Sequence, residues 1–393
     1  MDAVRRAIVS KFVNLNASLG PNAHLVGQPD GRLRLNTPAL ILDLDILERN
    51  ILLMSKHGQD HDLAIRPHVK CHKSAQIAAL QRAAGAMSFC CATIGEAEMM
   101  AAAGFTSILI TSPLVGEDKI GRAIALTQLD AQLCLVVDNP ANAAQLSDLC
   151  ALAGVSIDVL VDVDPGMHRT GVASQIAAIE LVGYVRSLPS LGYQGLQCYA
   201  GHVQHIEDAE ARQEASLAVM GALRVLCEEL KALDWAPAVI SGGGTGTYLI
   251  DAQAAVLTEL QAGSYVVMDN QYNNVWAANA LPPPFDVALF VQSAVISANH
   301  PGHVTCDAGF KHFAVDGGRP VVARGASLAS EYEYFGDVHG LVRTPPGQPQ
   351  PGLGARIEFV VPHCDPTINL YDQYHCVRGD QLVAIWPVDA RGV

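Results

Sequence analysis

The stretch "SIDVLVDVDPGMHRTGVASQIAAIELVGYVRSL", residues 156–188, holds one complete strand, loop and helix. Residues 156–164 are a short β-rich run, after which Pro165-Gly166 turns the chain. The apolar residues of 174–188 recur at intervals of three and four, as they do in an amphipathic helix. The stretch therefore predicts one unit in which a strand is followed by a helix.

The same strand-and-helix pattern occurs eight times from about residue 38. The other strand candidates begin at residues 39, 63, 88, 107, 133, 193 and 237. Eight regular alternations predict a (β/α)8 TIM barrel of the α/β class rather than an open doubly wound sheet.

The pattern changes at "ALPPPFDVALFVQ", residues 280–292, to short strands with Gly- and Pro-rich turns. We therefore expect the barrel over 38–280 and a β-rich C-terminal domain over 281–393. The leader, 1–37, is too short to fold alone, so we expect it to pack on the β domain.

The composition limits the partners of the chain. Its 393 residues include 39 acidic and 25 basic ones, and the net charge of -14 disfavours nucleic acid and anionic membrane surfaces. No segment approaches the roughly 18 uncharged apolar residues of a membrane span, and the N-terminus lacks a signal peptide. The ten cysteines contain no C-x-x-C pair, so we expect reduced thiols in the cytoplasm, no disulfides and a small-molecule substrate.

Basic residues are concentrated in "LAIRPHVKCHK", residues 63–73. Side chains alternate along a strand, so Arg66, His68, Lys70 and His72 would share one face. In a barrel that face lines the interior near the C-terminal mouth, where barrel enzymes keep their chemistry. Of the seven lysines in the chain, Lys70 is thus the best candidate for a desolvated amine that forms a Schiff base. The alternative is a solvated edge strand with basic decoration.

The glycine-rich stretch "ISGGGTGTY", residues 240–248, follows a strand candidate. Such a loop brings several backbone N–H groups close to an anion, as a phosphate requires. It lacks the Lys-Ser/Thr of a P-loop and the spacing of a dinucleotide-binding loop. We expect it on the eighth barrel strand, where phosphate sites are common. A tight turn without a ligand is the alternative.

Further candidate residues lie in three other stretches. In "DVDPGMHRTGV", 162–172, Arg169 could hold a carboxylate, a phenolate or a phosphate, or form a structural ion pair with Asp162 or Asp164. In "VPHCDPTINLYDQYH", 361–375, His363 and Asp365 would point the same way from an extended segment and could bind one divalent cation. His205, in "AGHVQHIED", is a candidate base or ligand. By residue type alone, the alternative for His363 and Asp365 is a surface histidine beside an aspartate in a turn. The alternative for His205 is an ordinary core or surface histidine.

Together these pieces resemble the D-threonine aldolase and D-serine dehydratase family, within the alanine-racemase-like, fold type III pyridoxal phosphate enzymes. The resemblance spans nearly the whole chain and rests on "TPALILDLDILERNI", "RPHVKCHK", "GMHRTGV", "LQCYAGHVQH", "GGGTGTY", "ELQAGSYVVMD", "DAGFK" and "PHCDPTINLYD", which occur in the family's order. It implies pyridoxal 5'-phosphate, a divalent metal (Mn, Mg, Co or Zn) and, by analogy, a homodimer.

The resemblance also implies roles for particular residues. Lys70 would be bound to the cofactor aldehyde, and Arg169 would sit close to the pyridine ring. The remaining cofactor-binding or mouth positions would be Tyr199, Gln204, His205, Gly243, Gly244, Thr245, Gly246 and Tyr265. His363 and Asp365 would hold the metal, and His205 would take the proton of the substrate's β-hydroxyl.

The second metal position is Asp, as in the aldolases of the family, whereas the dehydratases tend to carry Cys there. We therefore expect retro-aldol cleavage of β-hydroxy-D-amino acids of the D-threonine type. Three residues depart from the aldolase pattern, namely Ala92 and Thr93 where Gln and Lys are expected, and Val338 where Glu is expected.

Several alternatives remain open. A D-serine or 3-hydroxy-D-aspartate dehydratase would eliminate the same hydroxyl, and a 3-hydroxy-D-aspartate aldolase would release glyoxylate. A non-catalytic pyridoxal phosphate carrier would lack the β domain. A racemase would need a second base, which the sequence does not clearly offer, and a metal-only hydrolase would leave the glycine-rich loop without a role.

Overall fold

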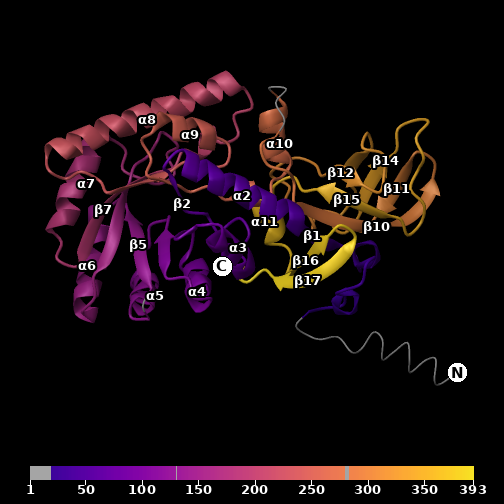
Figure 1. Cartoon of the computed structure of the whole chain (residues 1–393), viewed down its shortest axis with the longest axis horizontal. Coiled ribbons are helices and arrows are strands. Elements are labelled where there is room, and N and C mark those ends of the chain that lie inside the picture. Colours follow the sequence, from indigo (N-terminus) through magenta and orange to yellow (C-terminus); the bar gives the residue numbers. More distant parts are fainter. Residues whose placement is uncertain (1–18, 130, 279–282) are drawn as a thin grey trace. The chain divides into compact units, whose positions relative to one another are not determined.

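A computed structural model describes residues 19–129, 131–278 and 283–393 (Figure 1). The chain divides into two compact units. The β unit comprises 19–50, 266–271 and 285–391, and the barrel unit comprises 51–265, the described part of 272–284, and 392–393. The predicted limit between residues 280 and 281 and the first part of the predicted leader, 1–18, lie outside the described residues.

The barrel unit is built on eight parallel strands, so the predicted TIM-like α/β fold is confirmed. In sequence order these are β2 (Ala64–Ile65), β3 (Phe89–Cys91), β4 (Ser107–Ile110), β5 (Gln132–Val137), β6 (Ile157–Asp162), β7 (Leu191–Cys198), β8 (Val239–Gly242) and β9 (Glu259–Leu260). The strands are hydrogen-bonded in the order β2-β9-β8-β7-β6-β5-β4-β3, and a bridge between His68 and Cys90 joins the two ends.

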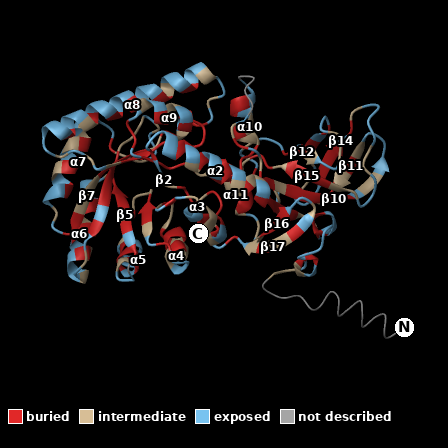
Figure 2. Cartoon of the chain, in the orientation of Figure 1, coloured by how far each residue is buried: buried red, intermediate tan, exposed pale blue. Residues whose placement is uncertain are grey.

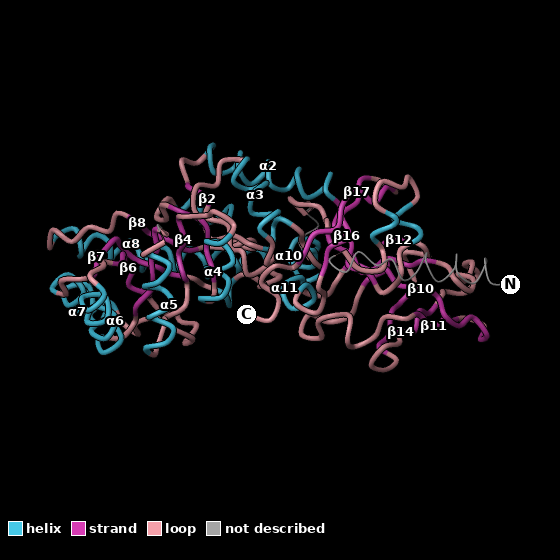
Figure 3. Tube along the Cα trace, turned by 90° about the horizontal axis from the view of Figure 1, so that it is seen from below, coloured by secondary structure: helices cyan, strands magenta, loops and turns pink. Residues whose placement is uncertain are grey.

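Helices surround these strands. They are α3 (Ala75–Ala83), α4 (Ile94–Ala102), α5 (Glu117–Thr127), α6 (Pro140–Ala153), α7 (Gln175–Ser187), α8 (Ala209–Ala232) and α9 (Tyr248–Ala254), and α2 (Leu44–Asp60) leads into the barrel unit. In Figure 2 the strands are coloured as buried and much of α8 as exposed, and in Figure 3 α5, α6 and α7 run along one side of the strands. Ser174 caps α7 and Asp208 caps α8 through side-chain oxygens, as their sequence positions favour.

The prediction that the strand at residue 39 begins the barrel is wrong. This strand, β1 (Ala39–Asp43), pairs antiparallel with β10 (Leu289–His300) and parallel with β16 (Gln373–Arg378) in the β unit. All five of its residues are buried, and a continuous apolar run has no alternation that would assign it to one sheet or another. The eighth barrel strand is instead β9, so the glycine-rich loop follows the seventh barrel strand, and the loop at 162–172 follows the fifth.

The β unit contains a nine-stranded, mostly antiparallel sheet in the order β11-β14-β13-β12-β15-β10-β1-β16-β17. The remaining strands are β11 (His303–Cys306), β12 (Val321–Arg324), β13 (Glu331–Tyr334), β14 (Gly340–Arg343), β15 (Arg356–Val360) and β17 (Gln381–Pro387). An additional pairing of β11 with β10 closes the strands from β10 to β15 into a ring.

Two short 3-10 helices precede β1, at Ala23–Leu25 and Gly31–Arg34. Leu25 and Leu35 pack in one buried cluster with Val377 and Leu382 of the β unit. No helix among the described residues combines the length and the apolar character that crossing a lipid bilayer demands.

Candidate active site

A cavity of about 300 Å³ lies in the barrel unit at the C-terminal ends of the strands. Its walls come from the ends of seven strands and from the start of α10 (Asn270–Ala277). The lining residues are His68, Lys70, Ala92, Thr111, Ser112, Arg169, Thr170, Gln197, Tyr199, Gly244, Thr245, Gln261, Gly263, Ser264 and Tyr272. This is the end of a (β/α)8 barrel at which catalytic groups converge.

Lys70 lines this cavity and is half-buried. The backbone N–H of Lys70 donates to Nδ1 of His68 at 3.4 Å, and Nε2 of His68 lies 3.1 Å from Oγ1 of Thr111. With Nδ1 facing the Lys70 N–H, Nε2 is the ring nitrogen of His68 that can donate to Thr111. The imidazole thereby fixes the turn on which the Lys70 amine stands.

The strand pattern predicted that the four basic residues from 66 to 72 share one face, and the structure shows that they do not. β2 ends at Ile65, and the chain turns from residue 69 onward, so the alternation stops. Arg66 instead lies 2.8 Å from the carboxylate of Glu259 on β9, with both side chains largely buried, and His72 is fully buried. His68 and Lys70 alone of the four line the cavity.

The three glycines of the glycine-rich loop, Gly243 to Gly246, lie where an added Cβ would collide with neighbouring atoms. A Cβ on Gly246 would lie 2.0 Å from the carbonyl oxygen of Gln204, and Gly243 has a φ of +68°, which favours glycine. The backbone N–H of Gly246 donates to Oε1 of Gln204 at 2.9 Å. Gly244 and Thr245 line the cavity, so this predicted cofactor loop does face Lys70's side of the barrel mouth.

A buried hydrogen-bond chain supports the loop from behind. Nε2 of Gln204 donates to the hydroxyl of Thr247 at 2.9 Å, and that hydroxyl donates to the Asp251 carboxylate at 2.5 Å. The hydroxyl of Ser216 donates to the other oxygen of Asp251 at 2.7 Å. Burial raises the pKa of Asp251 to about 6. Such a chain holds the backbone N–H groups of the loop in a fixed position, as anion binding requires.

Arg169 and Tyr199 lie together in the cavity wall, with the guanidinium carbon 5.4 Å from the centre of the tyrosine ring. Asp164, one of the two carboxylates considered as a partner for Arg169, is engaged elsewhere. It accepts backbone N–H groups of the 166–168 turn at 2.8 to 3.0 Å and lies 2.9 Å from Nδ1 of His168, whose side chain is exposed.

Asp162, the other carboxylate, lies buried beneath the cavity. Its Oδ1 accepts from Nε2 of Gln197 at 2.9 Å, and Oε1 of Gln197 accepts from Gln261 at 3.1 Å. Both glutamines line the cavity. Burial is the main cause that raises the pKa of the Asp162 carboxyl to about 6, from an ordinary value of 3.8.

Asp162→Asn should remove a dependence of stability on pH. The folded-state pKa exceeds the unfolded one, so this group favours folding below about pH 4 and loses that contribution as pH rises to about 6. The shift corresponds to about 3 kcal/mol. The asparagine can still accept from Gln197, so the variant should have a higher Tm than the parent chain at pH 8 and an equal Tm at pH 4. Equal Tm values at both pH values would contradict the assignment.

His205 is exposed, and its ring packs on Tyr272, with centroids 4.7 Å apart. Tyr272 belongs to the cavity wall, which places the imidazole at the rim of the cavity rather than in its lining. The buried guanidinium of Arg212 donates to the carbonyl oxygens of Ile206 and Glu207, at 2.5 and 3.2 Å. The segment after His205 is therefore fixed to α8.

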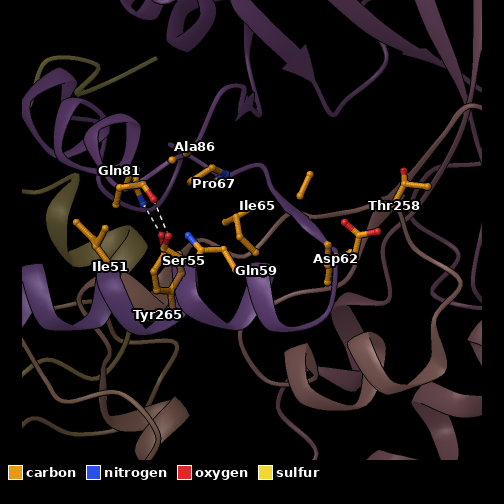
Figure 4. A pocket seen from close by; sticks show the side chains of 15 residues that line it. Ile51, Ser55, Gln59, Asp62, Ile65, Pro67, Gln81, Ala86, Thr258 and Tyr265 are labelled. Carbon is orange, nitrogen blue, oxygen red and sulfur yellow. Dashed lines mark hydrogen bonds between the residues drawn. The ribbon is translucent and has the colours of Figure 1, made fainter.

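Tyr265 does not line the Lys70 cavity. Its side chain is 1% exposed, and its hydroxyl accepts from Nε2 of Gln81 at 3.0 Å on the wall of a second cavity (Figure 4). Its backbone N–H donates to Oγ1 of Thr245 at 3.0 Å. Tyr265 thus supports the glycine-rich loop through its main chain.

The candidate metal residues, His363 and Asp365, lie in the β unit. His363 caps α11 (Cys364–Ile368), so Asp365 is in the first helical turn rather than in an extended segment, and strand alternation does not apply to the pair. Nδ1 of His363 lies 2.7 Å from the carboxylate of Asp316. A carboxylate on one ring nitrogen leaves Nε2 as the ligand atom and is typical of metal-binding histidines. Asp316 was not predicted, because it lies outside the stretch that contains His363 and Asp365.

Several residues of the cavity were absent from the sequence prediction. Thr111, Ser264 and Gln261 are among them. Ala92, one of the departures from the aldolase pattern, also lines the cavity. Thr93 instead caps α4, with its hydroxyl accepting from the backbone N–H of Glu96. The signal for Ser264 and Gln261 was the stretch "ELQAGSY", which contains β9, but two residues are too few for a period to be visible.

Two family models match the chain. The alanine racemase N-terminal domain matches residues 42–271, and the putative serine dehydratase domain matches residues 288–377. D-threonine aldolase from Arthrobacter sp is 39% identical over 92% of this chain and 94% of that protein. 3-Hydroxy-D-aspartate aldolase from Paracoccus denitrificans (strain Pd 1222) is 34% identical over 91% and 92%.

A solved structure shows the same fold. The crystal structure of D-threonine aldolase from Filomicrobium marinum superposes with a TM-score of 0.87 at 36% identity. The match covers 91% of this chain and 96% of the crystallised chain.

Proposed function

The chain belongs to the alanine-racemase-like family that contains the D-threonine aldolases and D-serine dehydratases, and we propose that it cleaves β-hydroxy-D-amino acids of the D-threonine type into glycine and an aldehyde. The proposed cofactors are pyridoxal 5'-phosphate and a divalent metal ion. The observation that carries the proposal is that a half-buried lysine and a glycine-rich loop line one cavity at the barrel mouth.

The residues of the cavity fit pyridoxal phosphate. The volume of about 300 Å³ lies at the lower end of the range of small-molecule sites. Gly244 and Thr245, which line the cavity, would lie against the phosphate, and the Lys70 amine would hold the aldehyde. Arg169 would lie beside the ring. When bound, the cofactor supplies an electron sink for breaking a bond at Cα.

The protein's own groups would then select the bond. His205, held against Tyr272, is the proposed base that takes the proton from the β-hydroxyl, which directs cleavage to the Cα–Cβ bond. The Lys70 amine would hold the cofactor aldehyde when no substrate is bound. Arg169 and Tyr199, which lie together in the cavity wall, would contact the cofactor ring.

His363 and Asp365 are the proposed metal ligands. The contact of His363 with Asp316 supports this role because it fixes the ring and makes Nε2 a better ligand. A site with few protein ligands and mixed N and O donors suits Mn, Mg, Co or Zn. A bound divalent ion supplies Lewis acidity toward a hydroxyl.

The charges in the cavity favour a substrate with one carboxylate. Among the described residues that line it, the lysine and arginine side chains are Lys70 and Arg169. Both are assigned to the cofactor, so the second carboxylate of 3-hydroxyaspartate would lack a cation of its own. D-threonine and its analogues have no second carboxylate and so need no such cation.

The test uses the protein loaded with pyridoxal phosphate and Mn²⁺, incubated with D-threonine or with 3-hydroxy-D-aspartate. We expect glycine and acetaldehyde from D-threonine, and we expect a chelator to stop the reaction while the cofactor stays bound. Ammonia and a 2-oxo acid would identify a dehydratase, and faster release of glyoxylate from 3-hydroxy-D-aspartate would identify the other aldolase. If neither substrate gives any product, the remaining interpretation is a non-catalytic protein that carries the cofactor.

We further propose a homodimer in the cytoplasm. The dimer rests on analogy with the fold and is tested by light scattering of the eluted holoenzyme. The ten free cysteines, most of them buried, support a reducing compartment.

A further inference from the structure

A second cavity in the barrel unit, of about 410 Å³, shares no lining residue with the Lys70 cavity. It lies between α2, the segment around β2 and the end of α3, and it is closed on one side by Tyr265 (Figure 4). Its residues come from positions 51–67, 81–86, 258 and 265. No part of the proposed reaction uses it.

Gln81 gives this cavity an unsatisfied acceptor. The residue is 2% exposed, and its Nε2 is used in the bond to the Tyr265 hydroxyl. Its Oε1 is buried and has no hydrogen-bond partner among the described residues. An unmet buried carbonyl is destabilising, and a donor placed in the cavity would offset that cost.

The other polar side chains of the lining are Ser55, Gln59, Asp62 and Thr258, of which the Gln59 amide can both donate and accept. The Ser55 hydroxyl donates to the carbonyl oxygen of Ala84 at 2.6 Å, so its remaining capacity is that of an acceptor. Asp62, at the other end of the cavity in Figure 4, is the one charged side chain in the lining. Acceptors and a carboxylate disfavour an anion and favour a cation with N–H donors.

Residues that are neighbours in the sequence line the two cavities. Tyr265 closes the second cavity, while its backbone N–H holds Thr245 and its neighbour Ser264 lines the first. On the other side, Pro67 lines the second cavity and His68 the first. A group bound against Gln81 and Tyr265 would therefore contact the segment whose backbone N–H holds Thr245 of the glycine-rich loop.

We propose that this cavity is a second ligand site, for a small organic cation with N–H donors such as a guanidinium on a short apolar tail, and that its occupancy changes the affinity for the cofactor. The binding site is independent of the proposed aldolase activity. Only the coupling rests on the assignment of Gly244 and Thr245 to the cofactor phosphate.

The experiment titrates ethylguanidinium into the cofactor-loaded protein by calorimetry. This probe cannot compete as a primary amine for the cofactor aldehyde. Propionamide, which is neutral, and propionate, which is anionic, are the matched controls. We expect ethylguanidinium to bind more tightly than propionamide and propionate not to bind.

Two variants locate the site. Gln81→Leu should weaken binding by about tenfold or more, because a hydrogen bond to a charged donor is lost. Asp62→Asn should weaken it by about twofold to fivefold at low salt, since the exposed carboxylate is screened. Near-normal Tm and visible absorbance of each variant show that it has folded and holds cofactor.

Three results would overturn the inference: no binding of ethylguanidinium, equal binding to Gln81→Leu, or equal binding of propionamide. The coupling is measured as the dissociation constant of pyridoxal phosphate with and without saturating ethylguanidinium. A change of about twofold or more supports it, and an unchanged constant removes it. Neither measurement needs turnover, so failure of the aldolase assay does not affect them.

Discussion

Lys70→Ala is expected to abolish the visible absorbance of the protein-bound cofactor and to lower turnover of D-threonine by more than about 10³-fold. The amine of Lys70 is the one lysine nitrogen in the lining of the cavity that faces the glycine-rich loop. Without it, the cofactor is held only by its phosphate and ring contacts, and the step that frees the product has no nucleophile.

Lys73→Ala is the matched control, because it removes a lysine from the same short stretch. The Lys73 amine donates to the backbone carbonyl of Val393 at 2.7 Å and does not line the cavity. This variant should keep its absorbance and its rate. Borohydride treatment of the parent holoenzyme followed by peptide mass analysis should find the cofactor on Lys70, and a label on Lys73 or on neither lysine would refute the assignment.

The regular alternation of strands and helices was sufficient to predict the barrel, but not its first and last strands. β1 is apolar on both faces, and its pairing with β10 and β16 depends on segments more than two hundred residues away. β9 has two residues, and only its pairing with β2 and β8 makes it a strand. Local period cannot report either kind of long-range pairing.

The site was predictable where a motif has a mechanical reason, and not where tertiary contacts decide. The loop at Gly243 to Gly246 needs glycine because Gln204 and Asp251 approach its backbone. That requirement appears in the sequence as a recognisable glycine-rich motif. The positions of the Arg66 and His72 side chains could not be predicted from the sequence, because they depend on Glu259 and on the turn that follows β2. Likewise, Asp316 reaches His363 only through the fold of the β unit.

His205→Ala is expected to lower kcat for D-threonine by about 10²- to 10⁴-fold, the usual contribution of a positioned base, with a small change in KM. The imidazole lies outside the lining of the cavity and contacts it through Tyr272, so the cofactor absorbance should stay intact. His202→Ala is the matched control, because His202 is an exposed histidine in the same loop, within Gly201–Val203. It should retain the parent rate.

The role of His205 can be separated from a general structural one by a reaction that has no β-hydroxyl. Exchange of the α-proton of glycine with deuterium from D2O requires the cofactor and Lys70, but no removal of a β-hydroxyl proton. His205→Ala should therefore exchange glycine protons at a rate within a few-fold of the parent chain while aldol cleavage falls by about 10²-fold or more. If exchange and cleavage fall by the same factor, His205 acts on the cofactor or on its loop, and another group must take the hydroxyl proton. If neither rate falls, the His205 imidazole that contacts Tyr272 has no part in catalysis.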